Sequence, residues 1–417
     1  MTSTTSVLAA LAIILIDLLG RAALDKVLAF SGGPTLVALW AQLQSVVELV
    51  SSVALAGVLQ GLTVLVARTH AAPDERSLLR ASLKLALGTA LAVALLSMLL
   101  TALLSDQLSR GRIATDLFWL AALSGCIAVL PATLNAYWLG KHQQQRMLRL
   151  ALLSGAILLA VAASAWLGLS LRALAWMQCA VLAGIAALVW RHLRKLMHGH
   201  ADHPLGAQPF RQLLRFVPVG LAIGIMSPVS MLLVRGMLAD TLSWDEVGFM
   251  QALWRCSEWV TATAAGVLSL VFLLRFSSAY GTAQFRREML RAAALVLLPA
   301  AIFLLLIYAN QRALLAMLYD ARFVVSDTAV AWFMLGSWVR IASWLFLFGL
   351  FAAQRTRLII AGEILSLPLY ALLLWLFAAG MTLERSALLY LLSYLVYLGF
   401  NLVGLSYPSR HARMVTR

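Results

Sequence analysis

Two charged residues, Arg255 and Glu258, interrupt a segment that is otherwise apolar, "GFMQALWRCSEWVTATAAGVLSLVF" at 248–272. Their spacing of three places both side chains on one face of a helix. A charged side chain at the centre of a bilayer costs about 2.5–3.5 kcal/mol on insertion scales, so it generally pairs with another charge or contacts a ligand. An arginine facing a cavity can bind an anion, because its planar guanidinium offers paired N–H donors and stays protonated.

Further charged residues lie in other apolar segments: Asp17, Arg21, Glu48, Arg235, Arg340 and Glu363. Asp17 and Arg21 are four residues apart, so a local ion pair and a role in a cavity are both open interpretations. Arg235 lies near the end of its segment, where its side chain could instead reach the membrane interface.

Arg340 is the residue that local pairing explains least. It lies well inside "WFMLGSWVRIASWLFLFGLF", and no acidic residue stands three or four positions away. Glu48 and Glu363 likewise have no basic residue three or four positions away. Arg340 therefore requires a hydrated cavity, a partner from another helix or an anionic ligand.

We expect four arginines from separate helices to line one cationic cavity that binds the substrate: Arg21, Arg235, Arg255 and Arg340. Arginine suits a diphosphate because its planar fork binds pairs of oxygens. Four carboxylates are expected to couple ion movement or to pair with these arginines: Asp17, Glu48, Glu258 and Glu363. The sequence has no nucleotide-binding loop and no acidic metal cluster, so we expect no cofactor, no metal and no enzymatic activity.

Composition identifies the elements that hold these residues. Of 417 residues, 62% are hydrophobic and 12% are charged, whereas a soluble domain is about half apolar and a quarter charged. The apolar residues form blocks of about 20, the length of helix that crosses a bilayer. The pattern predicts an all-α polytopic membrane protein with about twelve spans, at 7–30, 36–67, 79–104, 117–139, 147–169, 173–190, 216–238, 246–274, 290–309, 328–353, 358–379 and 386–406.

The net charge of +15 is concentrated in alternate connections, which indicates a membrane topology rather than nucleic-acid binding. One set of connections is strongly basic, with residues such as Arg80, Lys141 and Arg146, while the other has few basic residues, among them Arg112 and Arg172. The positive-inside rule then places both termini and the basic connections in the cytoplasm.

The longest connection falls near the midpoint and suggests two lobes. We predict an N-terminal six-helix lobe at 1–195, a cytoplasmic linker at 196–212 and a C-terminal six-helix lobe with a short cytoplasmic tail at 213–417. The linker contains His198, His200 and His203, for which a solvated basic loop is favoured over a metal site because no fixed set of ligands accompanies them.

Short matches between the halves indicate a duplication. "AGVL" at 56–59 returns at 265–268, a shift of 209 residues that also relates Gln42 to Gln251 and Lys26 to Arg235. Two halves of six spans each start on the same side of the membrane, which is a parallel 6+6 repeat.

Two stretches resemble bacterial O-antigen and enterobacterial common antigen flippases. These are "SWDEVGFMQALWRCSEWVTATAAGVLSLVFLLRFS" at 243–277 and "FSGGPTLVALWAQLQSVVELVSSVALAGVLQGLTVLVAR" at 30–68. Those flippases belong to the multidrug/oligosaccharidyl-lipid/polysaccharide (MOP) exporter superfamily, so the resemblance implies a fold like that of MATE transporters. The "GRAALDKVLAF" segment at 20–30 departs from the lysine-bearing, glycine-rich segment of many relatives, which leaves Arg21 and Lys26 open as substrate contacts.

The resemblance implies a flippase of the bacterial inner membrane. Its substrate would be an oligosaccharide on undecaprenyl diphosphate, moved from the cytoplasmic to the periplasmic leaflet by alternating access, with Arg255 carried over as a substrate contact. The implied partners are this glycolipid, the bilayer and polysaccharide assembly proteins, with no nucleic acid. An ion-coupled exporter or a peptidoglycan-precursor flippase of the same superfamily is the alternative, and a membrane-bound glycan polymerase or ligase is less favoured.

Overall fold

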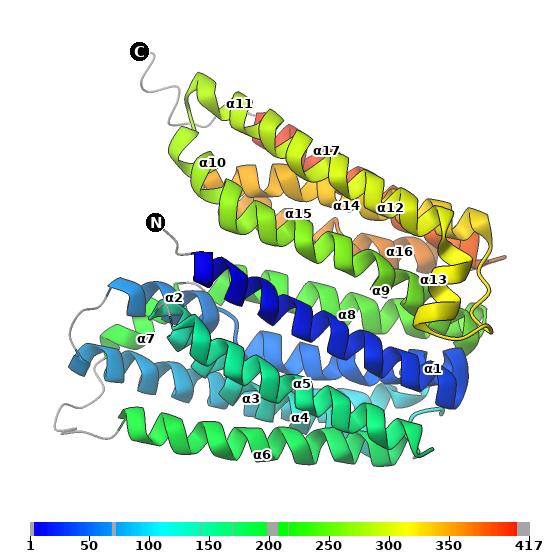
Figure 1. Ribbon diagram of the computed structural model, residues 1–417, viewed down its shortest axis with the longest axis horizontal. Helices are drawn as coiled ribbons and strands as arrows, with labels where there is room; N and C mark the ends of the chain where they lie inside the picture. Colours follow the sequence, from blue (N-terminus) through cyan, green and yellow to red (C-terminus); the bar gives the residue numbers. More distant parts are fainter. Residues whose placement is uncertain are drawn as a thin grey trace. The chain divides into compact units, whose positions relative to one another are not determined.

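The computed structural model describes residues 4–68, 72–141, 143–168, 170–197, 207–215 and 217–406, and over these ranges the chain is helical with no β-strand (Figure 1). The first eight helices are α1 (Thr4–Ala54), α2 (Val58–Arg68), α3 (Ala72–Ser109), α4 (Thr115–Gly140), α5 (Gln144–Trp166), α6 (Leu171–Met197), α7 (Ala207–Leu214) and α8 (Val217–Thr241). The others are α9 (Trp244–Val267), η1 (Leu268–Phe272), α10 (Leu273–Ala279), α11 (Ala283–Ala292), η2 (Ala293–Leu297), α12 (Leu298–Ala309), α13 (Gln311–Leu318), α14 (Asp327–Ala352), α15 (Thr356–Ile364), α16 (Leu367–Leu376) and α17 (Leu383–Ser406). The predicted all-α polytopic class is confirmed.

Nine helical segments among the described residues are long and apolar enough to cross a membrane. The described residues of each predicted apolar block are mainly helical, but some spans are built from several elements. Span eight consists of α9, η1 and α10, span nine of α11, η2 and α12, and span eleven of α15 and α16. Pro368, in the first turn of α16, cannot donate a backbone hydrogen bond, which accounts for the interruption before it.

A break at Gly33 divides α1 into the first two predicted spans. Gly33 has φ 70° and ψ −165°, a conformation that only glycine adopts readily, and Pro34 follows it. The proline lacks the amide hydrogen that would continue the helix. The chain therefore changes direction here without a loop.

The repeated "AGVL" motif coincides with an interruption in both halves. In the first copy Leu55–Gly57 forms a turn, with Gly57 at φ 75°, before α2 begins. In the second copy α9 ends at Val267 and the π-helical η1 begins at the next residue. The related glutamines Gln42 and Gln251 are both buried.

Contacts divide the chain into two compact units. Unit 1 comprises Met1–Gly236 and Leu318–Asp320, and unit 2 comprises Met237–Met317 and Ala321–Arg417. Of the predicted linker at 196–212, residues 198–206 lie outside the described residues, His198, His200 and His203 among them, while 207–212 form most of α7. The lobes at 1–195 and 213–417 stay a prediction.

In unit 1, α1 packs against α3, α4 and α5, and α4 also contacts α6 (Figure 1). Gly125 of α4 permits the close approach to α1, since a Cβ there would lie 2.8 Å from the Val47 carbonyl oxygen. Most of α8 belongs to this unit because it runs along the second half of α1. The Ser52 hydroxyl donates to the Gly224 carbonyl at 2.7 Å, and the Gln42 amide donates to the Leu232 carbonyl at 3.1 Å.

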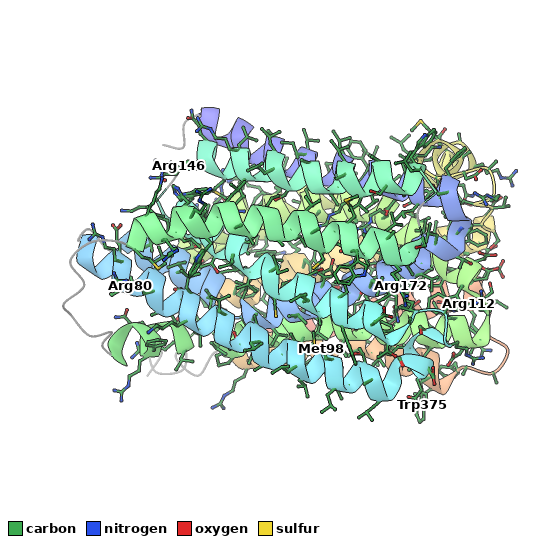
Figure 2. All side chains as sticks on the ribbon, turned by 90° about the horizontal axis from the view of Figure 1, so that it is seen from below. Arg80, Met98, Arg112, Arg146, Arg172 and Trp375 are labelled. Carbon is green, nitrogen blue, oxygen red and sulfur yellow. The ribbon has the colours of Figure 1, made fainter. Side chains whose placement is uncertain are left out.

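Basic residues of unit 1 that were predicted on opposite sides of the membrane lie at opposite ends of its helices. Figure 2 shows Arg80 and Arg146 at one end of the helices and Arg112 and Arg172 at the other. Successive antiparallel spans produce this alternation. Which end faces the cytoplasm stays a prediction.

Unit 2 is centred on α14 and α17, which pack along their length, with α9, α10 and α12 against α14 and with α16 against α17. Tyr370, Tyr390, Tyr394 and Tyr397 are among its most completely buried large side chains. This aromatic interior positions the charged residues of α9 and α14.

Candidate functional site

The Arg340 guanidinium of α14 lies among aromatic rings from three helices. Its Cζ is 4.7 Å from the ring centroid of Trp344, 5.1 Å from that of Trp254 on α9 and 5.7 Å from that of Tyr394 on α17. A cation within about 6 Å of such a ring is attracted by its quadrupole. We call Arg340 and these three rings the arginine cage.

The cage leaves hydrogen-bonding capacity unused. The Arg340 Nε is buried and has no acceptor among the described residues, while the Tyr390 hydroxyl interacts with another part of the guanidinium. A guanidinium has five N–H donors, and buried donors are nearly always paired. Aromatic faces stabilise the charge without accepting those hydrogens in the way an oxygen does, so the site can still bind an oxyanion.

The local sequence explains why the rings gather here. Tyr390, Tyr394 and Tyr397 follow one face of α17 at spacings of four and three. Gly336, one turn before Arg340, has no side chain to obstruct Tyr390, because a Cβ there would lie 2.6 Å from the tyrosine ring. Ser343 adds a second link to α17 by donating to the Tyr394 carbonyl at 3.3 Å.

Two carboxylates border the cage from different helices. Glu258 of α9 pairs with Arg255, Oε2 to Nη1 at 2.6 Å, and also interacts electrostatically with Arg340. Glu363 of α15 accepts a hydrogen bond from the Tyr397 hydroxyl at 3.2 Å and interacts electrostatically with Arg340. The structure thus brings together Arg255, Arg340, Glu258 and Glu363.

These four charges can sum to zero, with two cations and two anions. The expected excess of positive charge is therefore not a property of the cluster when both glutamates are ionised. An incoming anion would compete with Glu258 and Glu363 for the guanidinium groups. Such competition can link ligand binding to rearrangement or protonation of a carboxylate.

Unit 1 holds the other two arginines. Arg235 of α8 is 5% exposed and its Nη1 donates to the Ala41 carbonyl at 3.1 Å and to the Ser45 hydroxyl at 2.6 Å, both on α1. Arg21 and Asp17 form an ion pair of 3.0 Å within α1, with side chains 36% and 54% exposed. The local pairing considered for Asp17 and Arg21 is observed.

Glu48 is exposed on α1, on the stripe between Ser45 and Ser52 that contacts α8. A shared cavity containing all four arginines stays a prediction. Among the described residues no group of three or more His, Cys, Asp or Glu is placed to hold a metal ion.

Sequence reasoning did not assign Tyr394 of the cage or its neighbours Tyr390 and Tyr397 on α17. The signal was present, because tyrosines at 390, 394 and 397 share one face of an apolar span that also contains Arg385 near its start. The contact between Trp254 and Arg340 joins positions far apart in the chain, so no local spacing indicates it.

No protein-family model matches the chain. A stretch of 187 residues is 24% identical to the lipid III flippase of Escherichia coli (strain K12), and equally to the lipid III flippase of Shigella flexneri. The match spans 45% of this chain and 45% of each relative, less than half of either protein.

Similarity to solved structures extends over nearly the whole chain. The lipid II flippase MurJ in an inward closed conformation aligns with a TM-score of 0.73 at 12% identity, over 96% of this chain and 88% of that one. An inward-facing multidrug resistance MATE transporter aligns at 0.70 and 10% identity, over 94% of each chain. A MOP-superfamily transporter from Pyrococcus furiosus aligns at 0.65 and 12% identity, over 96% and 94%. The chain has the all-α fold of MOP-superfamily transporters.

Proposed function

We propose that this protein is a flippase that moves an undecaprenyl-diphosphate-linked oligosaccharide from the cytoplasmic to the periplasmic leaflet of the bacterial inner membrane. The substrate would be a repeat unit of the O-antigen or common-antigen type. The two units would alternate access to it, with both termini in the cytoplasm. No covalent bond is made or broken.

The observation that carries the proposal is the arginine cage with its free Nε. A buried guanidinium with unused donors suits an anionic headgroup such as diphosphate. Arg255 lies beside it on α9 and would join it when Glu258 is displaced. Arg21 and Arg235 are proposed as further contacts, and Asp17, Glu48 and Glu363 as coupling or pairing residues. Partial identity to lipid III flippases and the MOP-type fold support the same substrate class.

A second candidate function is the flipping of a peptidoglycan precursor. The structural similarity to the lipid II flippase MurJ favours it, and the cage would serve either diphosphate headgroup. The identity of the sugar separates the two candidates. An ion-coupled exporter of the same superfamily fits less well, because the unused Nε donor of Arg340 suits an anion and not a cationic drug. A glycan polymerase or ligase is disfavoured, since the sequence shows no large extramembrane catalytic loop.

The test is deletion of the gene, followed by mass spectrometry of undecaprenyl-linked lipids. Accumulation of a complete repeat unit on undecaprenyl diphosphate, with loss of a surface polysaccharide, is the expected result. Wild-type protein should restore export, and so should Trp332→Leu, which changes a residue of α14 outside the cage, whereas Arg340→Ala should not. Accumulation of a peptidoglycan precursor would favour the second candidate. Normal surface glycan together with altered drug resistance would contradict both.

Association with polysaccharide assembly proteins is proposed as well. Affinity capture of the protein after cross-linking in intact cells should recover glycan polymerase or chain-length components. An equal yield of these proteins with an unrelated polytopic membrane protein would contradict that association.

A further inference from the structure

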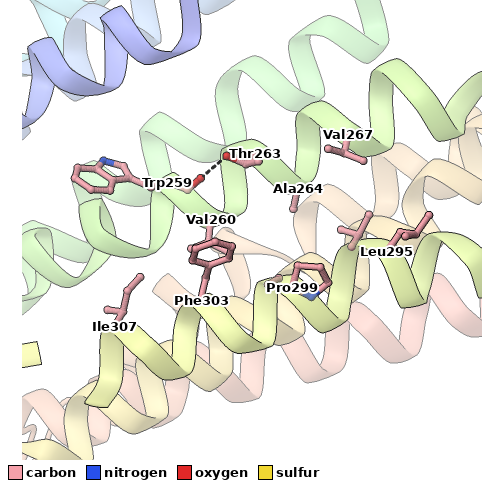
Figure 3. Close-up of a pocket in the computed structure, with 11 residues that line it drawn as sticks. Trp259, Val260, Thr263, Ala264, Val267, Leu295, Pro299, Phe303 and Ile307 are labelled. Atoms are coloured by element: carbon pink, nitrogen blue, oxygen red, sulfur yellow. Dashed lines mark hydrogen bonds between the residues drawn. The ribbon is translucent and has the colours of Figure 1, made fainter. Parts of the chain in front are cut away.

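An open groove of about 370 Å³ runs between α9 and α12 in unit 2 (Figure 3). Its walls include Trp259 and Val260 at one end and Val267 and Leu295 at the other, with Phe303 between them. Leu295 and Phe303 are 63% and 59% exposed, so the groove lies on the surface of the unit. We call it the α9–α12 groove.

The groove is lined almost entirely by apolar side chains, and a charged residue of α9, Arg255, follows beyond its Trp259 end. The Thr263 hydroxyl within the groove donates to the Trp259 carbonyl at 2.8 Å and is therefore already satisfied (Figure 3). Trp259, at one end of the groove, carries an indole N–H. Arg255 precedes Trp259 by four residues, so it lies one helical turn beyond that end on the same side of α9. At a rise of about 1.5 Å per residue, Arg255 is about 6 Å along the axis from Trp259, and Val267 is about 12 Å beyond it. This order matches a ligand with an anionic head and an apolar chain.

Two π-helical segments border the apolar end. η1 begins directly after Val267, and η2 contains Leu295 and Val296. A π-helical turn adds a residue to the helix and shifts the side chains that follow, and such segments are frequent at functional sites. A Cβ built on Gly266 would meet no atom within 4 Å, so the backbone beside the groove also has open space.

We infer that the α9–α12 groove holds the head-proximal part of a polyprenyl chain whose diphosphate lies at Arg255. The inference rests on the proposed function and assigns the lipid part of the substrate to a site separate from the arginine cage. The aromatic and branched walls, Trp259, Val260 and Phe303, complement a methyl-branched isoprenoid better than a straight acyl chain. Since membrane lipid is as apolar as the groove, shape rather than a hydrophobic driving force must select the chain. The expected gain in affinity is therefore modest.

Site-specific photo-cross-linking tests this placement directly. The full-length protein, in nanodiscs of phosphatidylethanolamine and phosphatidylglycerol, carries p-benzoyl-phenylalanine in place of Phe303, with undecaprenyl diphosphate as the probe. The matched control carries it at the adjacent Ile302, which is 51% exposed and does not line the groove. At least fivefold more adduct to the polyprenyl chain at 303 than at 302 is expected. Equal yields, or adducts to phospholipid alone at 303, would overturn the inference.

A groove-filling variant provides the second test. Leu295→Trp should weaken binding of undecaprenyl diphosphate three- to tenfold and leave isopentenyl diphosphate unchanged, because that short chain does not reach the apolar end. Gly266→Ala, which enters open space, should bind both as wild type does. Retention of the isopentenyl ligand shows that the variant is folded. If Leu295→Trp binds undecaprenyl diphosphate fully, the groove inference alone fails; if wild-type protein binds no isoprenyl diphosphate, the proposed function fails as well.

Discussion

Arg235 in unit 1 and Arg340 in unit 2 are both arginines inside apolar helices, but their surroundings differ in kind. Arg235 donates to oxygen atoms of α1, the Ala41 carbonyl and the Ser45 hydroxyl. Arg340 faces rings, and its Nε has no acceptor among the described residues. Oxygen acceptors use up donors, whereas aromatic faces stabilise charge and leave donors available. Burial alone therefore does not identify a ligand-binding arginine; the chemistry of its partners does.

The largest expected effect is the loss of transport in Arg340→Ala. One hydrogen bond to a charged group contributes about 1.5–3 kcal/mol, which corresponds to roughly 10- to 100-fold in binding. Arg340→Lys keeps the charge but loses the planar fork, so it should recover only part of the activity. Flipping of a polyprenyl-diphosphate glycolipid in proteoliposomes measures both. Wild-type transport by Arg340→Ala would remove the cage from the mechanism.

Arg235→Ala should instead lower stability. Truncation leaves the Ser45 hydroxyl and the Ala41 carbonyl without their donor, at a cost of about 1–3 kcal/mol. Thermal unfolding in detergent, followed by fluorescence-detected size exclusion, measures the loss, while transport per folded molecule should change less than in Arg340→Ala. The double variant Arg235→Ala with Ser45→Ala should lose less stability than the sum of the losses in the two single variants, because the two residues share a hydrogen bond. Full stability with abolished transport would make the proposed substrate contact, and not the links to α1, the main role of Arg235.

Loss of one ring should weaken the cage by a smaller amount. Trp344→Leu removes a cation–π contact of about 0.5–2 kcal/mol, so affinity for a diphosphate lipid should fall between about 2- and 30-fold. Trp332→Leu is the matched control, since Trp332 lies on the same helix, is 36% exposed and is outside the cage. Isothermal titration with undecaprenyl diphosphate compares the two. Equal effects would mean that the rings act only through general packing.

Neutralising Glu363 should strengthen ligand binding at the arginine cage, whereas loss of Arg340 or Trp344 should weaken it. Glu363→Gln keeps an oxygen for the Tyr397 hydroxyl but removes a negative charge that competes for Arg340. Binding of undecaprenyl diphosphate should strengthen severalfold. Glu384→Gln, at the exposed start of α17, should leave it unchanged. Weaker binding in Glu363→Gln alone would show that the carboxylate orients the cage instead of competing with the ligand.

Sequence patterns predicted the helices well because apolar blocks of bilayer length have few alternatives. They also predicted the Arg255–Glu258 pair, which depends only on helical spacing. The arginine cage depends on packing between α9, α14 and α17, and no periodicity within one segment specifies that contact. The π-helical segments likewise arise from packing, so the apolar pattern of spans eight and nine predicts only continuous helices.

The smallest expected effect concerns Asp17 and Arg21, the exposed counterpart of the pair in unit 2. Their side chains are 54% and 36% exposed, against 32% for Glu258 and 16% for Arg255. An exposed ion pair contributes about 0.2–1 kcal/mol, so Arg21→Ala should lower the unfolding free energy by no more than about 1 kcal/mol. The charge swap Asp17→Arg with Arg21→Asp keeps the ion pair but moves the guanidinium one helical turn along α1. If pairing is its whole role, the swap should retain stability and transport, because both charges are still matched. If Arg21 binds the diphosphate, transport should fall while stability holds, and the assay would then place a ligand contact in unit 1 as well as in the cage.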